Sequence, residues 1–171
     1  MRMGVICLLY KTHAAGGFIA GFLITGDPLS GAIAMVSSLI PDIESPKSFI
    51  GRKLPIISHA NRMVFGHRQV FHSLVGSLAF FLISLCIVKG FHFPMQYAYA
   101  ALIGYLSHLV LDSFNPAGVP WLWPLGFRLK IPLTQSGGIL ERLVIMPGMM
   151  LIAVVLLGKH LLPFLDLFGR R

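Results

Sequence analysis

Charge is scarce in this sequence, and acidic residues are the scarcest. Only 12% of the 171 residues are Asp, Glu, Lys or Arg, and six are acidic, whereas about a quarter of a soluble domain is charged. This composition excludes an ordinary soluble globule. Two cysteines, Cys7 and Cys86, lie far apart in apolar runs. Their spacing implies no disulfide framework and no thiolate zinc site, and both are expected to be buried as small hydrophobes.

Hydrophobic residues, in contrast, make up 56% of the chain. Their long runs predict an integral membrane protein whose partner is the lipid bilayer. The net charge of +8 comes from basic residues in the loops between apolar segments. The positive-inside rule puts them there, so we expect no nucleic-acid partner. The predicted fold is all-α: a single integral membrane domain over residues 1–171, a polytopic bundle of about five apolar helices.

The first two helices are predicted to be short. After an N-terminal extension at 1–11, a helix is expected over 12–26 and another over 30–40. Each is shorter than the roughly 20 residues of a usual span, so the two should form a tight hairpin. If the first helix begins near Met3 instead, it is long enough to span the bilayer.

A stripe of small residues follows His13 on this first helix. Gly17 and Gly21 lie four and eight residues after it, and so on the same helix face. Such a stripe permits close approach of another helix, and we assign the two glycines to helix packing.

Three longer apolar segments are predicted to span the membrane: 70–88, 95–111 and 139–157. The last contains Pro147, where a kink is expected. The basic loop at 43–67 and the loop at 113–138 are assigned to the cytoplasmic side. Residues 158–171 form a tail.

His108 and Asp112 are the centre of the candidate site. Their i, i+4 spacing places an imidazole beside a carboxylate on one helix face. Ionisable groups in or beside a membrane helix usually face a protein interior or a wet cavity. Strict alternation of the spans brings further imidazoles and carboxylates to the same membrane face. The full set is His13, Asp42, Glu44, His67, His72, His108 and Asp112.

Imidazole with carboxylate is a ligand set for a divalent metal, with zinc as the first choice and manganese or iron as alternatives. Seven donors are too many for one tetrahedral ion and suit two or more. A water at an open position would have its pKa lowered toward neutrality and become a nucleophile. Arg68 would neutralise a phosphate or carboxylate of the substrate, and Arg68 and Glu44 are the candidate catalytic residues.

Each cluster also has a purely structural explanation. The His108–Asp112 pair could make a simple interhelical hydrogen bond, and the acids at 42 and 44 could end a solvated loop. His67 and His72 are five apart, so they converge only if His67 precedes the first helical turn. Glu141 is assigned to an ion pair with the next residue, or to orienting a ligand. The coincidence of all the clusters favours a metal site.

Four motifs in order resemble the bacterial YdjM family. They are Thr12-His13 before small residues, Pro41-Asp42-x-acid, HRxxxHS at 67–73, and HxxxD at 108–112 followed by NPAGVPWLWP. The resemblance covers about residues 12–145. It implies a metal-dependent hydrolase of the bacterial inner membrane, in some members under LexA (SOS) control. The positions it implies for the metal are His13, Asp42, His67, His72, His108 and Asp112. Glu44 stands where the family has Asp, and reaches about one methylene further.

These features favour a multi-pass hydrolase of the bacterial inner membrane. Its substrate would be a phosphoester or other ester, small or in a lipid, at the cytoplasmic face. The family is also distantly similar to the zinc-dependent phospholipase C and P1-nuclease group, although a likeness of fold does not fix a substrate. Two alternatives from other classes are a metal-ion or small-solute transporter and a non-catalytic membrane scaffold.

Overall fold

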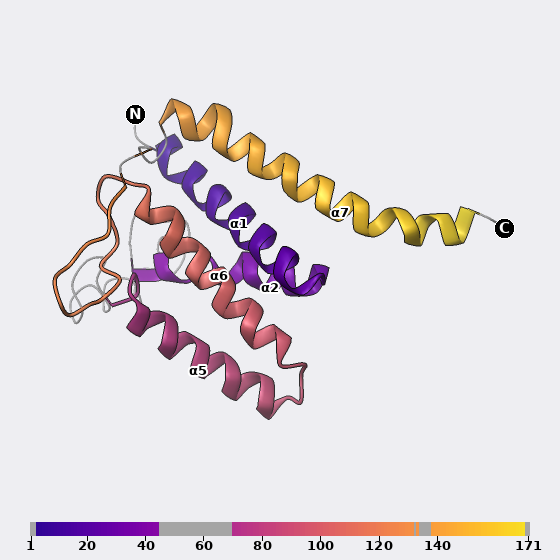
Figure 1. Cartoon of the computed structure of the whole chain (residues 1–171), viewed down its shortest axis with the longest axis horizontal. Helices are drawn as coiled ribbons and strands as arrows, with labels where there is room; N and C mark the ends of the chain where they lie inside the picture. Colours follow the sequence, from indigo (N-terminus) through magenta and orange to yellow (C-terminus); the bar gives the residue numbers. More distant parts are fainter. Residues whose placement is uncertain (1–2, 45–69, 132, 134–137, 170–171) are drawn as a thin grey trace.

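The structure is a computed structural model that describes residues 3–44, 70–131, 133 and 138–169, with side chains at 10–43, 70–131, 133 and 138–162. The described chain is helical, apart from one isolated antiparallel bridge between Val119 and Leu129. The all-α prediction is therefore confirmed. The helices are α1 (Met3–Thr25), α2 (Pro28–Ser37), α5 (Leu74–Gly90), α6 (Gln96–Ser113) and α7 (Met146–Gly169), with short turns η1 (Pro41–Glu44) and η2 (Glu141–Ile145) (Figure 1).

Helix α1 begins at Met3, so the start predicted at residue 12 was wrong and the alternative start is confirmed. Lys11 interrupts the apolar run but not the helix, because lysine is a good helix former and its side chain is exposed here. The helix ends at Thr25, and Gly26 after it has a positive φ of 68°, which suits a glycine that follows a helix C-terminus.

Asp27 begins the next helix immediately, so α1 and α2 form the predicted hairpin, but only α2 is short. Its carboxylate accepts hydrogen bonds from the backbone N–H groups of Leu29 and Ser30, and Pro28 occupies the first turn. The Ser30 hydroxyl donates to the same carboxylate at 2.7 Å. That hydroxyl bond and the two backbone bonds hold the pKa of Asp27 below its usual value.

Helix α2 lies between α1 and α6, and small residues make this possible. A Cβ on Gly17 would lie 2.6 Å from the carbonyl oxygen of Ala34, and one on Gly21 would lie 2.5 Å from its Cβ. A Cβ on Gly104 of α6 would overlap the Ala34 backbone from the other side. The packing expected of the glycine stripe is therefore present, and α2 is held at one fixed depth between its neighbours.

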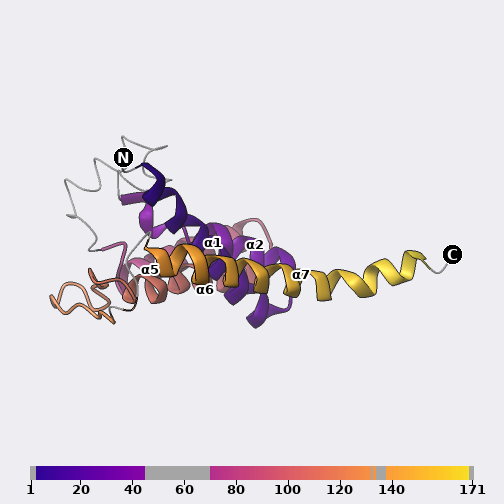
Figure 2. The same ribbon diagram turned by 90° about the horizontal axis from the view of Figure 1, so that it is seen from above.

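The remaining helices flank this group. Helix α5 packs against α6 and α7 against α1, and the C-terminal part of α7 extends beyond the other helices (Figures 1 and 2). Among the described residues one helix, Glu141–Leu162, is long and apolar enough to cross a membrane by length and composition. The segments Pro28–Ile43 and Leu74–Gly90 are apolar but shorter.

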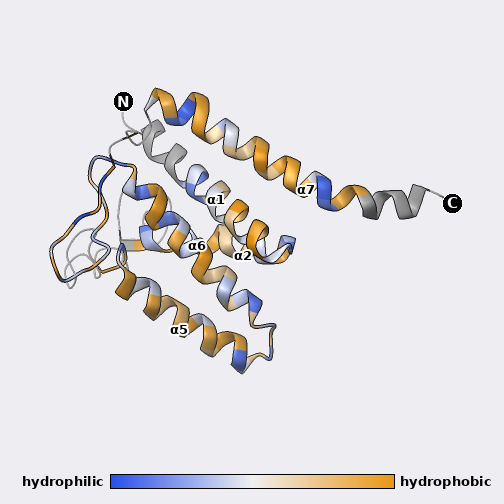
Figure 3. Ribbon diagram, in the orientation of Figure 1, coloured by the Kyte–Doolittle hydropathy of each residue, from blue (hydrophilic) through white to orange (hydrophobic). Residues whose placement is uncertain are grey.

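The exposed faces of α5 and α7 are apolar. Leu78 and Ile83 on α5 and Leu151 and Val154 on α7 are each more than half exposed, and both helices are mostly orange in Figure 3. Cys86 also lies exposed on α5, so its predicted burial was wrong: an apolar residue can face outward here. The buried side chains of the described residues, in contrast, include many serines, histidines and carboxylates. This distribution is expected where helices face lipid and enclose polar groups.

The sequence predicts a kink at Pro147, and the structure has a π-helical turn, Glu141–Ile145, just before it. The Met146 N–H donates to the Glu141 carbonyl, five residues back. Pro147 has no N–H of its own to continue the ladder. π-Helical turns occur often at functional sites, and this one begins with Glu141 buried.

Candidate metal centre

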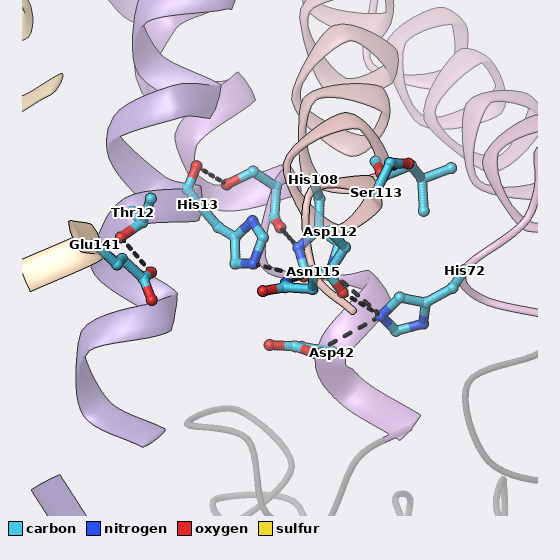
Figure 4. A network of polar contacts seen from close by, with 11 residues as sticks. Thr12, His13, Asp42, His72, His108, Asp112, Ser113, Asn115 and Glu141 are labelled. Atoms are coloured by element: carbon cyan, nitrogen blue, oxygen red, sulfur yellow. Dashed lines mark hydrogen bonds and ion pairs between the residues drawn. The ribbon is translucent and has the colours of Figure 1, made fainter. Parts of the chain in front are cut away.

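Five of the seven predicted ligand residues lie together in the structure (Figure 4). His13 comes from the middle of α1, Asp42 from η1, His72 from the turn before α5, and His108 and Asp112 from the last turns of α6. All five are buried. The helix ends and turns that carry them are far apart in the sequence, so the predicted convergence is present for these residues.

The other predicted site residues are not described. His67 and Arg68 lie outside the described residues, as does most of the basic loop at 43–67. Glu44 ends η1, two residues after Asp42, but its side chain is also outside the described part. Their proposed roles remain predictions.

The carboxylate of Asp112 is the centre of the cluster. Its Oδ1 lies 3.3 Å from His13 Nε2 and accepts a hydrogen bond of 3.0 Å from Asn115 Nδ2. Its Oδ2 lies 3.5 Å from His72 Nε2 and 3.6 Å from His108 Nε2. One carboxylate oxygen of Asp112 therefore faces His13, and the other faces His72 and His108.

The ring of His108 is oriented by the backbone. Its Nδ1 lies 2.7 Å from the carbonyl oxygen of Ser38, so Nδ1 carries the proton and donates it. In the neutral ring this leaves Nε2 with a free lone pair, directed at His72 Nε2 3.3 Å away. A histidine that binds metal through one nitrogen usually donates its other N–H to a carbonyl or carboxylate. His108 is arranged in this way.

Ser38 also connects the two helices that carry His13 and His108. Its hydroxyl donates to the His13 carbonyl at 2.9 Å, while its own carbonyl accepts from His108. The two imidazole rings stack, with centroids 3.9 Å apart and planes at 23°. The end of α2 therefore fixes both rings relative to each other.

The turn that carries His72 is held in place by the loop after α6 and by α6 itself. The Tyr105 hydroxyl donates to the Phe71 carbonyl at 2.6 Å. The Leu74 N–H donates to the Trp121 carbonyl at 2.9 Å. Hydrogen bonds on both sides of His72 limit its backbone, so its imidazole stays aimed at Asp112.

The spacing of three donor atoms suits one ion. The atoms His72 Nε2, His108 Nε2 and Asp112 Oδ2 are separated from one another by 3.3, 3.5 and 3.6 Å. Around a tetrahedral ion with bonds of about 2.0–2.1 Å, neighbouring donors lie about 3.3–3.4 Å apart. Asp42 Oδ1, 3.9 Å from His72 Nε2, is a candidate for a further ligand.

His13 has a ring nitrogen that also indicates a bound ion or water. Its Nδ1 is buried and has no hydrogen-bond partner among the described residues. A buried polar nitrogen without a partner is costly. An ion or an ordered water on this side of the cluster would remove that cost.

The described donors do not make two complete centres. Besides the triangle of His72, His108 and Asp112, two groups have suitable spacing: His13, His108, Asp112 and Asp42, His72, His108. Like the triangle, both contain His108. Because its Nδ1 is committed to Ser38, His108 has one nitrogen to offer and can join one ion only. Two full centres would need ligands beyond the described side chains.

Sequence reasoning missed several residues of the site. Ser38 and Asn115 were not predicted. The buried 2.8 Å hydrogen bond that the Glu141 carboxylate accepts from Thr12 was not predicted either, and the pairing of Glu141 with the next residue or a role in orienting a ligand stays a prediction. Asn115 lies three residues after Asp112, and that spacing could have indicated it. Ser38 orients His108 through its main-chain carbonyl, and no sequence pattern predicts such a contact.

A cavity of about 410 Å³ adjoins the cluster, between α1, the end of α6 and η2. His13 is part of its wall, so the cluster and the cavity are continuous. Its lining includes Thr12, His13, Asn115 and Glu141 together with Leu111, Phe114 and Ile145.

Comparisons with known proteins find related sequences. A family profile described as "YdjM inner membrane protein" matches residues 8–164. "Inner membrane protein YdjM" of Escherichia coli (strain K12) is 40% identical over 116 residues, which are 66% of this chain and 59% of that protein. The protein of the same name from Shigella flexneri matches to the same extent, so the match spans 59% of the length of both relatives.

A third relative is matched over more of its length. "Uncharacterized protein YvsG" of Bacillus subtilis (strain 168) is 36% identical over 147 residues, 82% of this chain and 89% of that protein. No solved structure matches the chain. The inner-membrane description of the profile and of two relatives supports an inner-membrane location for this chain.

Proposed function

The chain belongs to the YdjM family of inner membrane proteins, and from that premise we propose that it is a multi-pass, metal-dependent hydrolase. Its substrate would be a phosphoester or other ester at the cytoplasmic face. The observation that carries this proposal is the buried triangle of donor atoms from His72, His108 and Asp112. Two segments far apart in the sequence are needed to build it: the turn before α5 supplies His72, and α6 supplies His108 and Asp112, all side chains of a metal-binding type.

The distribution of polarity supports the multi-pass arrangement. Helices α5 and α7 expose leucine, isoleucine and valine on their outer faces, while the polar cluster is enclosed. Apolar side chains are stable in contact with the hydrocarbon of a bilayer, whereas ionisable groups are costly there and are enclosed by protein. The short helix α2 packs against both α1 and α6, so these two helices would support it where it does not match the bilayer thickness.

Zinc is the first choice of ion, with manganese or iron as alternatives, because the donors are imidazole and carboxylate. When bound, such an ion supplies Lewis-acid activation of a water. The residues of the chain position the donors. The Ser38 carbonyl sets the tautomer of His108, and the Asn115 amide holds Oδ1 of Asp112 while Oδ2 faces the two imidazoles. Arg68 remains the candidate for binding substrate charge, and Glu44 for a further catalytic or metal role.

The test is the metal content and hydrolytic activity of detergent-purified protein. The wild-type chain should contain a divalent metal and hydrolyse members of a phosphoester and ester panel. His108→Ala should lose both, because it removes the donor that both candidate groups share. His92→Asn is the matched control: His92 lies exposed in a turn with a positive φ of 56°, which asparagine tolerates. Full metal occupancy in His108→Ala would overturn the assignment.

A non-catalytic scaffold is the second candidate. The observation that favours it is the set of contacts between Asp112 and three histidines, which ties helices together without an ion. A scaffold would contain no metal after purification and would melt at the same temperature with and without chelator. A transporter is not supported by the described donors, since they form one group rather than a path along the helices.

A further inference from the structure

The cavity beside the cluster has walls of two kinds. His13 and Asn115, which both contact Asp112, form part of its wall, and the carboxylate of Glu141 and the hydroxyl of Thr12 form another polar part. Much of the rest is apolar and includes Phe114. A ligand that fills this cavity must be amphipathic, with its polar end toward the cluster.

The position of the cavity along the apolar segment Glu141–Leu162 sets its level in the membrane. Glu141 and Ile145 line it, and they belong to the first turns of the segment Glu141–Leu162 that is long enough to cross a bilayer. The first turns of such a segment lie where headgroups meet acyl chains. The metal cluster adjoins this level through His13.

Water is a poor occupant of such a space. About 410 Å³ would hold roughly a dozen water molecules at about 30 Å³ each. Several of them would face leucine, isoleucine or phenylalanine, which offer no hydrogen bond. The volume falls in the usual range of about 300–1,000 Å³ for small-molecule sites, whose walls are mostly apolar with a few placed polar groups.

We propose that this cavity binds an acyl chain of a phospholipid, and that the ester-bearing end of the same lipid reaches the metal cluster past His13. The inference rests on the proposed function, because it names the substrate class of that site. Glu141, held by Thr12, would then lie beside the lipid near its polar end. The hydrocarbon chain would contact Phe114 and Ile145.

Photo-crosslinking tests the proposal without relying on hydrolysis. The full chain is reconstituted in phosphatidylethanolamine bilayers containing phosphatidylglycerol with a diazirine in one acyl chain, irradiated, and digested for peptide mapping. The peptide carrying Phe114 should be labelled. Ile145→Trp, which fills the cavity, should remove most of that labelling. Val154→Trp, a change of similar size on the exposed face of the same helix, should leave it unchanged.

Competition separates a lipid from a soluble phosphate. Excess unlabelled phosphatidylglycerol should lower the labelling at Phe114, and glycerol phosphate should not. Displacement by glycerol phosphate, or labelling confined to the exposed faces of α5 and α7, would overturn the proposal. Metal is measured on the same samples. Metal-loaded protein without label at Phe114 would contradict the lipid site but not the metal-dependent hydrolase. Label at Phe114 in protein that contains no metal would support the lipid site and contradict the hydrolase.

Discussion

At the scale of single residues, the site depends on groups that hold the ligands as much as on the ligands themselves. Asp112 must share one carboxylate among three imidazoles. The Asn115 amide donates to Oδ1 and so fixes the carboxylate plane. Without that bond the carboxylate could rotate, and Oδ2 would leave the position that it holds between His72 and His108.

Asn115→Ala should therefore weaken metal binding by about 10–100-fold, the usual effect of losing a hydrogen bond to a ligand. The measurement is competition against a chelator of known affinity. Ser107→Ala is the control, since its hydroxyl bonds the nearby Gly104 carbonyl and does not contact the cluster. An unchanged affinity in Asn115→Ala would show that the carboxylate is fixed by other contacts.

At the scale of helices, α2 is the element that sets the geometry of the site. It carries Ala34, which lies against glycines of both α1 and α6, and it ends near Ser38, which bonds to both His13 and His108. A change that displaces α2 should thus alter packing and metal binding together.

Gly104→Ala makes this change with a single methyl group. The added Cβ would overlap the Ala34 backbone, which cannot rotate away as a side chain would. Overpacking of this kind costs about 1–3 kcal/mol, and the displaced Ser38 carbonyl should lower metal affinity as well. Thermal melting in detergent and chelator competition measure the two effects.

Gly158→Ala on α7 is the control for this experiment. Nothing lies within 4 Å of a Cβ built there, and replacing a glycine by alanine inside a helix adds about 0.5–1 kcal/mol of stability. Equal melting temperatures for Gly104→Ala and the wild type would contradict the tight fit of α2.

The sequence predicts much of this arrangement, and the limits have physical causes. The i, i+4 spacing of His108 and Asp112 and the stops at Gly26 and Pro41 are local features, so the helices and their polar ends follow from them. The start of α1 was predicted wrongly because Lys11 interrupts the run of apolar residues but does not interrupt the helix. Contacts made through a carbonyl, such as that of Ser38, leave no side-chain signal.

At the scale of the whole molecule, the candidate ligands come from separate parts of the chain. His13, Asp42, His72 and the α6 pair belong to four segments that must be brought together for an ion to bind. An ion that binds the folded state only adds stability, about 2.7 kcal/mol when its concentration is one hundred times the dissociation constant.

Chelator should accordingly lower the melting temperature of the wild-type protein, and added zinc should restore it. His108→Ala should show a smaller response to both treatments, because its ion site is already impaired. Differential scanning measurements in one detergent, with and without chelator, make the comparison. A wild-type melting temperature that is the same with and without chelator would support the scaffold function.

The acceptor for His108 is a main-chain oxygen, and this has a consequence for how the site tolerates sequence change. Whatever side chain occupies position 38, the peptide still carries a carbonyl there. An insertion of one residue in α2, however, would turn that carbonyl by about 100° around the helix axis. The imidazole would lose its acceptor although every ligand was still encoded. The spacing of the chain between Asp27 and Pro41 is therefore as much a determinant of metal chemistry as the identity of any histidine.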